Sequence, residues 1–403
     1  MRLLFLTPQL PYPPRQGSAL RNYYLLRGLV EAGLSVDLLS FASPEQIATI
    51  QQNPLTTLCR RLELVPLPPS RSLTTRLWTL LAAKPDLAGR LVSPIYAARL
   101  QTMLAEVDYL QVEGVEMAPY ALNLRQPFYF DAHNAEFVIQ QRAARTDMGS
   151  LRRWPKAAYS WVQARRLRQY ERMILGRARR VLAVSAVDAV ALTSLEPQAA
   201  SKIVVIANGV DTAEYAPAAQ PTLPESWAAV SMVFTGVLDY RPNVDALDWF
   251  CRLVWPTIYA TSPAARCYIV GAKANATVQA LAAIPGVVLV GEVAAVQPYI
   301  AAASLFVVPM RIGGGSRLKL LQALAMGKCI LSTTLGAEGI AVSPGLDVAV
   351  ADSAADFAAT ALRLLNDPGE RDRYATAARQ LALQYDWQQI IPRLSALYAA
   401  DSD

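Results

Sequence analysis

The sequence predicts an α/β protein with two Rossmann-like halves, each built on a doubly wound parallel sheet. Three observations support this fold class. Short apolar runs alternate with helical patterns, a proline-rich segment interrupts the alternation, and the alternation then starts again. The length of 403 residues also suits two domains of roughly 200 residues each.

The first domain is expected to span 1–216, because the proline-rich segment 217–229 lacks periodicity and predicts a linker. The clearest helix in this half is 19–32, which follows the first strand. Its predicted strands are residues 2–6, 35–40, 62–66, 108–112, 127–131, 180–184 and 203–206.

The second domain is expected to span 230–385. Ligands of such sheets bind at the carboxyl ends of the strands, so we expect the two domains to face each other across a cleft. The last segment, 386–403, contains an amphipathic helix, and one predicted arrangement is that this helix packs back on the first domain. The predicted strands here are residues 230–235, 266–270, 287–290, 304–308, 329–332 and 348–350.

A glycine-rich turn at 313–315 joins one of these strands to a helix. Backbone N–H groups and the helix dipole at such a turn can hold a phosphate or diphosphate. Ser316 is predicted to cap the helix, and Arg317 and Lys319 place positive charge in its first turn. The alternative is an ordinary joint between a strand and a helix.

Composition indicates a well-buried globular protein, with 53% apolar and 17% charged residues. No apolar run approaches the roughly 18 residues that span a bilayer, and the N-terminal apolar run is too short for a signal peptide. We therefore expect a cytoplasmic protein. The four cysteines lack metal-type spacing, which favours free thiols.

The segment 151–180 carries ten Lys/Arg against one acid, a net charge of +9, while the whole chain carries +6. Tryptophan and tyrosine side chains are interleaved with this charge. The pattern suits an anionic membrane surface or a lipid-phosphate acceptor, which would make the protein peripheral at the inner face of the membrane. A solvated helix face is the alternative. Nucleic acid is not expected, because no recognition motif accompanies the charge.

Several ordered motifs resemble the retaining GT-B glycosyltransferases, in particular glycosyltransferase family four, the group 1 glycosyl transferases. They span nearly the whole chain. The motifs are a loop with Gly17 in PYPPRQGSALRNYYL (11–25), DAHNAE (131–136), VLAVSAVDAVAL (181–192), IANGVDTAEY (206–215), FTGVLDYRPNVDALDWF (234–250), YIVGA (268–272), GEVAAVQPYI (291–300) and the glycine-rich stretch. The resemblance implies a GT-B fold, with the donor in the second domain and the acceptor in the first.

The resemblance assigns His133, the only histidine of the chain, to a position near the donor sugar. Here the imidazole can hydrogen-bond a sugar hydroxyl or a migrating proton. Asp131 is a candidate for orienting the loop and Glu136 for starting a helix. A purely structural role is the alternative for all three residues.

The resemblance also implies a donor-diphosphate site. Its members would be Gly17, Gly236, Arg241, Gly314, Gly315, Ser316, Arg317, Lys319 and Gln322. The family commonly carries two glutamates in the glycine-rich region; this chain has Gly314 and Gln322 at those places, which puts the sugar and the activity in question. An amide can still hydrogen-bond ribose hydroxyls, although less strongly than a carboxylate.

The function that follows is transfer of a sugar from a nucleotide-sugar donor to a glycan or polyprenyl-lipid-linked acceptor, with retention of configuration. Polysaccharide biosynthesis is the expected setting. No metal or other cofactor is expected, because no aspartate pair ends a strand. Two alternatives stay open: a non-catalytic nucleotide-sugar-binding protein, and a sugar-nucleotide epimerase or phosphorylase of similar shape.

Overall fold

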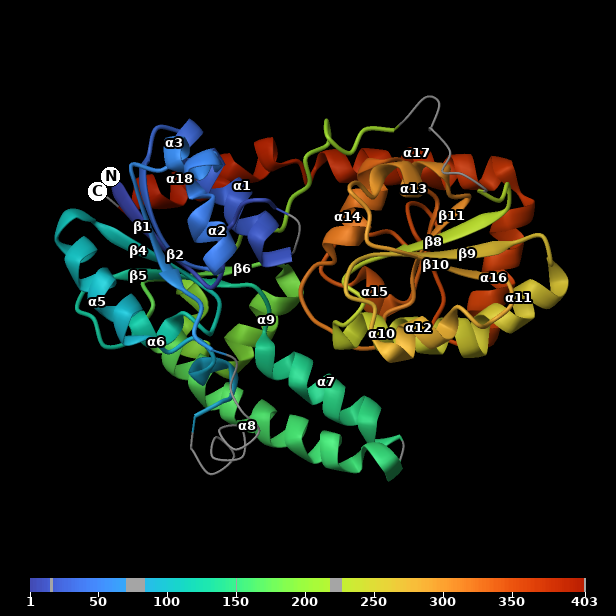
Figure 1. Ribbon diagram of the computed structural model, residues 1–403, viewed down its shortest axis with the longest axis horizontal. Helices are drawn as coiled ribbons and strands as arrows, with labels where there is room; N and C mark the ends of the chain where they lie inside the picture. Colours follow the sequence, from blue (N-terminus) through green and yellow to red (C-terminus); the bar gives the residue numbers. More distant parts are fainter. Residues whose placement is uncertain (15–16, 70–83, 150, 218–226, 402–403) are drawn as a thin grey trace. The chain divides into compact units, whose positions relative to one another are not determined.

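The computed structural model describes residues 1–14, 17–69, 84–149, 151–217 and 227–401 (Figure 1). Most of the predicted linker lies outside these ranges. The chain divides into two compact units. The first is Met1–Asn208 with Trp387–Asp403, and the second is Gly209–Asp386.

The first unit contains a seven-stranded parallel sheet in the order β3-β2-β1-β4-β5-β6-β7. Each strand matches a predicted strand, with ends that differ by at most two residues. The order reverses direction between β1 and β4, which makes this the switch point of the sheet. The strands are β1 (Arg2–Thr7), β2 (Ser35–Ala42), β3 (Arg61–Pro66), β4 (Tyr109–Glu113), β5 (Phe128–Ala132), β6 (Arg180–Ala183) and β7 (Ile203–Val205).

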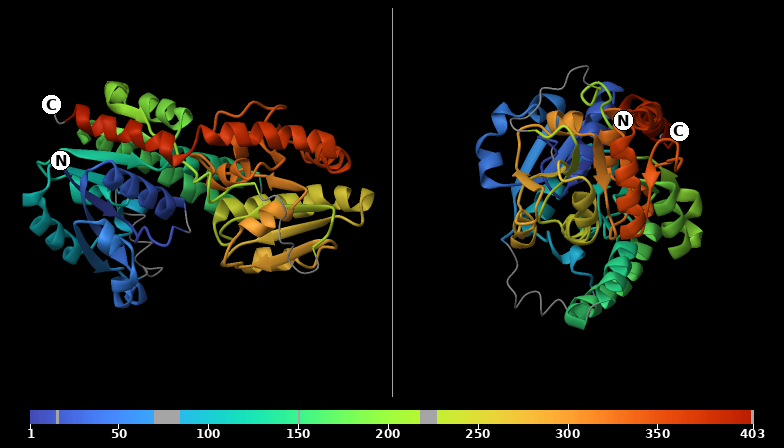
Figure 2. Two further views of the ribbon diagram at one scale, coloured as in Figure 1. Left: turned by 90° about the horizontal axis from the view of Figure 1, so that it is seen from above. Right: turned by 90° about the vertical axis from the view of Figure 1, so that its right-hand side faces the viewer.

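Helices cover this sheet, and the hairpin of α7 and α8 projects away from it (Figures 1 and 2). The α-helices are α1 (Gly17–Glu31), α2 (Pro44–Ala48), α3 (Leu55–Leu58), α5 (Pro94–Met103), α6 (Ala118–Ala121), α7 (Glu136–Met148), α8 (Trp154–Arg177), α9 (Ala186–Leu195) and α18 (Trp387–Ala400). Short 3-10 helices are η1 (Ile50–Gln52), η2 (Leu87–Gly89), η3 (Leu104–Glu106), η4 (Leu151–Arg153) and η5 (Pro197–Lys202).

The C-terminal helix α18 belongs to the first unit. Its apolar stripe of Trp387, Ile390, Leu394 and Tyr398 is buried in the core that β1, β2 and α1 also form. Burial of such a stripe supplies most of the stability of a surface helix. Gly28 on α1 permits the approach, because a Cβ there would lie 2.4 Å from the Ile391 side chain.

The second unit contains a six-stranded parallel sheet in the order β10-β9-β8-β11-β12-β13. Here too every strand corresponds to a predicted one, and the switch point lies between β8 and β11. The strands are β8 (Ser231–Thr235), β9 (Arg266–Val270), β10 (Val287–Gly291), β11 (Leu305–Val308), β12 (Ile330–Ser332) and β13 (Ala349–Val350).

The helices of the second unit enclose one large apolar core, in which all the strands take part. They are α10 (Arg241–Trp249), the π-helical turn η6 (Phe250–Val254), α11 (Trp255–Thr261), α12 (Ala276–Leu281), α13 (Gln297–Ala302), α14 (Leu318–Ala325), α15 (Thr334–Ala337), α16 (Ala354–Asn366) and α17 (Pro368–Leu383). The four cysteines are buried free thiols, as predicted. Within the described residues, every helix is too short or too polar to cross a membrane.

Candidate functional site

Polar side chains gather at the switch point of each sheet, at the carboxyl ends of the strands. In the first unit they come from α1, β4, β5 and the residues after β5. In the second unit they come from the loops after β8 and β11 and from α14. Since a switch point leaves a crevice between diverging loops, these two places are the first candidates for ligand binding.

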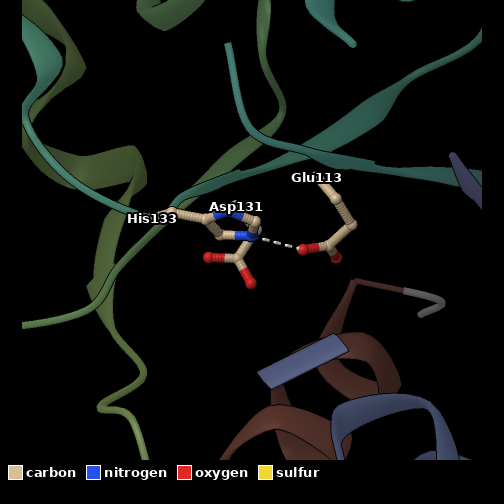
Figure 3. Close-up of side chains that lie close together, drawn as sticks. All are labelled: Glu113, Asp131 and His133. Carbon is tan, nitrogen blue, oxygen red and sulfur yellow. Dashed lines mark hydrogen bonds and ion pairs between the residues drawn. The ribbon is translucent and has the colours of Figure 1, made fainter. Parts of the chain in front are cut away.

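His133 lies just beyond β5, and its ring is fixed by Glu113, the last residue of β4. His133 Nε2 lies 2.9 Å from Glu113 Oε2 (Figure 3). The parallel pairing of β4 and β5 sets Glu113 beside Asp131, which explains how residues distant in sequence meet. The Glu113 side chain is fully buried, whereas the His133 side chain retains 17% of its exposure.

Burial disfavours a charged imidazole, but the hydrogen bond to Glu113 and the negative charges of Asp131 and Glu113 outweigh it. They raise the pKa of His133 above its usual value. Burial and the neighbouring Asp131 also raise the pKa of Glu113, although its bond to His133 opposes this. Because the two groups share a hydrogen bond, a change in the protonation of one alters the pKa of the other.

Two further side chains hold Glu113. Gln111 Nε2 donates to Glu113 Oε1 at 3.0 Å. Asn22 of α1, with its amide oriented to suit its neighbours, donates to Glu113 Oε2 at 2.8 Å. Because both carboxylate oxygens have donors, the carboxylate presents a fixed edge to the imidazole.

Asp131 is paired with Arg21 of α1. The Arg21 guanidinium lies 2.8 Å from Asp131 Oδ2, and both side chains are buried. Arg21 also donates to the Ala207 carbonyl and to Asn208 Oδ1, at 3.1 and 3.2 Å. This pair therefore joins α1 and β5 to the start of the NGVD segment.

Glu113, Asp131 and His133 each offer an atom within 4.8 Å of the others, a spacing that a metal ion could use. Their partners argue against such a site. The Arg21 cation already neutralises Asp131, and Glu113 is engaged by His133, Gln111 and Asn22. A divalent ion would have to stand beside a buried guanidinium, which is electrostatically unfavourable.

Two other predicted residues of the first unit, Glu136 and Gly17, stand at the beginnings of helices. Glu136 does begin α7, and burial raises its pKa to about 7. Gly17 is the exposed first residue of α1, and no described contact joins it to His133. Arg21 and Asn22, one turn along α1, reach the cluster instead.

In the second unit, Gly236, Asn243 and Lys319 meet at the carboxyl end of β8. Lys319 Nζ donates to Asn243 Oδ1 at 2.8 Å and lies 3.8 Å from the centre of the Phe234 ring. A Cβ at Gly236 would lie 2.8 Å from both Lys319 Nζ and Asn243 Nδ2. Glycine is therefore required at Gly236 for the lysine to reach this position.

Burial, together with the nearby Arg317, lowers the pKa of Lys319 well below its usual value. The structure thus holds two cationic side chains close together at the end of a buried strand. An anion beside them would restore the charged form of the lysine, so the arrangement favours binding of an anion.

The glycine-rich turn after β11 folds around the Arg317 side chain. Gly315 has a left-handed φ of +64°, and the Arg317 guanidinium donates to the carbonyls of Gly314 and Gly315. The prediction that Ser316 caps the following helix is wrong. α14 begins at Leu318, so its N-cap position is Arg317, and the Arg317 side chain makes no capping hydrogen bond.

The remaining predicted residues have other surroundings. Gln322 donates to the Tyr215 hydroxyl at 2.8 Å, within the same unit. Arg241 is the exposed first residue of α10, whereas Asn243 of the same turn contacts Lys319. Sequence reasoning missed Asn243, Arg21 and Glu113. For Glu113, the available signal was an acid at the end of an apolar strand.

Comparison with protein-family models gives two matches in order along the chain. Residues 16–214 match the model described as Glycosyltransferase Family 4, and residues 229–367 match Glycosyl transferases group 1. No curated protein sequence matches the chain.

The chain is also similar to solved structures along nearly its whole length. One is HepE of Anabaena in complex with UDP and glucose, with 15% identity, a TM-score of 0.67, and coverage of 98% of this chain and 99% of that one. Another is sucrose-phosphate synthase of Thermosynechococcus elongatus, with 17% identity, a TM-score of 0.74 and coverage of 99% of both chains. A third is S. aureus TarM in complex with fondaparinux, alpha-GlcNAc-glycerol and UDP, with 10% identity, a TM-score of 0.67, and coverage of 99% and 100%. At these identities the likeness shows the fold.

Proposed function

The chain belongs to the group 1 glycosyl transferases of glycosyltransferase family four, with the GT-B fold, and we propose that it transfers a sugar from a UDP-sugar donor to a glycan or lipid-linked acceptor, with retention of configuration. UDP is favoured because HepE is solved with UDP, UDP and glucose, and UDP-glucose. The setting we propose is polysaccharide biosynthesis on the cytoplasmic side of a membrane.

The observation that carries this proposal is the cationic cluster at the switch point of the second sheet. Lys319 and Arg317 lie beside Gly236 and the glycine-rich turn, and both belong to the N-terminal end of α14. A diphosphate seated there would receive charge-assisted hydrogen bonds, which strengthen as negative charge grows on the leaving group. Side-chain cations supply the charge neutralisation, so we propose that no metal is needed.

The reaction breaks the bond between the anomeric carbon and a diphosphate oxygen and forms one to an acceptor oxygen. With retention, the acceptor hydroxyl approaches the face that the diphosphate leaves, and its proton passes to the departing diphosphate oxygen. We propose that His133, held by Glu113, hydrogen-bonds a hydroxyl of the donor sugar during this step.

We also propose that the α7–α8 hairpin contacts an anionic membrane. Leu151, Trp154 and Trp161 are 77%, 56% and 59% exposed near the hairpin tip. Arg165 and Arg168 follow on α8 and are also exposed. Exposed tryptophan next to arginine suits a lipid headgroup layer.

Sedimentation with anionic vesicles tests this membrane proposal. At high salt, the double variant Trp154→Ala with Trp161→Ala should reduce vesicle binding more than a variant with Arg165, Arg166 and Arg168 neutralised. The reason is that salt already screens the charge of the arginines. Unchanged sedimentation of both variants would refute the membrane contact and leave the solvated helix face.

The test of the proposed reaction is release of nucleoside diphosphate from UDP-, GDP- and TDP-sugars. Wild type is compared with Lys319→Met and His133→Gln. Slow hydrolysis of a UDP-sugar that both variants lose supports a glycosyltransferase. Binding of UDP without turnover of any donor, with His133→Gln silent, would favour the non-catalytic alternative. Epimerised donor without released diphosphate would favour an epimerase.

A further inference from the structure

We infer that Gln111 and Tyr398 are positioning residues for His133, and that the C-terminal helix α18 thereby sets the orientation of the imidazole. The inference deepens the proposed function and rests on its assignment of His133. It comes from a continuous line of buried hydrogen bonds across the first unit.

The line has three bonds. The Tyr398 hydroxyl donates to Gln111 Oε1, Gln111 Nε2 donates to Glu113 Oε1 at 3.0 Å, and Glu113 Oε2 lies 2.9 Å from His133 Nε2. The side chains of Tyr398, Gln111 and Glu113 are fully buried. His133 is the one member of this line with an exposed fraction, so the line ends where a substrate can reach it.

The direction of these bonds follows from the chemistry of the groups. An ionised carboxylate only accepts, so the nitrogen of the Gln111 amide must face Glu113. The amide oxygen then faces Tyr398, whose hydroxyl must donate. Glu113 in turn accepts from Nε2–H of His133, which leaves Nδ1 as the nitrogen on the other side of the ring.

The Nδ1 side of the His133 ring lies next to Gly114. A Cβ placed at Gly114 would lie 3.6 Å from His133 Nδ1 and 3.0 Å from Glu116 Oε2. Glycine at this position therefore keeps the space beside Nδ1 open. The positioning line thus holds Nε2 against Glu113, and Nδ1 is the nitrogen left for a substrate contact.

Without its tyrosine, the amide of Gln111 can rotate and turn its oxygen toward Glu113. Such a rotation would disfavour the ionised carboxylate and weaken its hold on the imidazole. Among the described residues, the charged groups that face this region are Arg21 of α1, Glu113 of β4, Glu116 of the following loop, Asp131 of β5 and Glu136 of α7. Tyr398→Phe changes none of these charges.

The chain has a single histidine, so NMR of histidine-labelled, untagged protein shows one imidazole without any assignment. We expect wild type to show the Nε2–H tautomer when neutral. In Tyr398→Phe, the pKa of His133 should fall by about half a unit to one unit, since a buried hydrogen bond contributes a net effect of this order. kcat should fall about 3- to 10-fold, with KM for the donor within about twofold.

Tyr109→Phe is the matched control. The Tyr109 hydroxyl also bonds the C-terminal segment, donating to the Asp401 carbonyl at 2.6 Å, but it lies outside the line. We expect it to leave the pKa of His133 unchanged. An unchanged pKa in Tyr398→Phe, or an equal shift in the control, would overturn the inference.

A second variant keeps the test decisive if Tyr398→Phe folds poorly. Gln111→Met removes the middle of the line and should lower the pKa of His133 by at least as much. A failure of the proposed function can be distinguished from a failure of this inference. If His133→Gln keeps full activity, the catalytic assignment fails, whereas the imidazole pKa still decides whether the line positions the ring.

Discussion

Replacing Lys319 by methionine tests the anion site most directly. Methionine keeps an unbranched apolar stem over the Phe234 ring and removes only the ammonium, which now lies 2.8 Å from Asn243 Oδ1. A hydrogen bond from a charged donor contributes about 1.5–3 kcal/mol. Since about 1.4 kcal/mol corresponds to a factor of ten, Kd for UDP should rise about 10- to 100-fold.

Whereas Lys319→Met should weaken UDP binding, it should leave the stability of the unliganded protein unchanged or raise it. Burial lowers the pKa of Lys319, so the folded protein carries a cost for the charged form. Between that lowered pKa and the ordinary value of 10.5, the unfolded chain binds a proton that the folded chain lacks. Stability of the unliganded protein therefore rises with pH across this window. Lys319→Met should lose this rise and have an equal or higher Tm at pH 7.

Calorimetric titration with UDP measures the affinity and also the protonation of Lys319, because a bound diphosphate should restore the proton of Lys319. Above the lowered pKa, the binding enthalpy of wild type should depend on the ionisation enthalpy of the buffer, and that of Lys319→Met should not. Lys328→Met is the control: this partly buried lysine has a pKa lowered to about 8 and donates to the Ala301 carbonyl instead. Affinity of Lys319→Met within twofold of wild type would refute the reasoning.

Three other outcomes are expected. Gly236→Ala should weaken UDP binding at least tenfold by calorimetry, because its Cβ would meet Lys319 Nζ at 2.8 Å. Glu113→Gln should lower the pKa of His133 toward or below its ordinary value in the NMR titration, because the carboxylate charge that raises it is removed. Asp401→Asn should lower Tm at pH 7 but not at pH 2. The Arg180 guanidinium lowers the pKa of Asp401 to about 2, so its stabilisation is present above its ordinary pKa of 3.8 and is lost as pH falls to about 2.

Strand positions were predictable because buried parallel strands are short apolar runs, and each predicted run became a strand. The order of the strands was not visible in the sequence. Nothing local to DYLQVE or PFYFD indicates that β4 pairs with β5, yet that pairing brings Glu113 beside Asp131. The partner of His133 could therefore not be identified from motif spacing.

The second-unit site was more accessible to sequence reasoning, because glycines mark close approaches of the backbone. Gly236 and Lys319 were both singled out, and the structure brings them together. Asn243 was missed because an asparagine in a first helical turn usually serves a local cap. Ser316 was misjudged as that kind of cap, since the turn stays irregular for one residue longer than expected.

The two switch points differ in their balance of charge, and under the proposed function this difference assigns the donor diphosphate to the second unit. In the first unit, Arg21 is matched by Asp131, and His133 by Glu113, so an added anion would meet buried carboxylates. In the second unit, the described partners of Lys319 are the neutral Asn243 and the Phe234 ring. We therefore propose that a doubly charged leaving group is stabilised at the second sheet, and that the imidazole at the first sheet contacts an uncharged sugar hydroxyl.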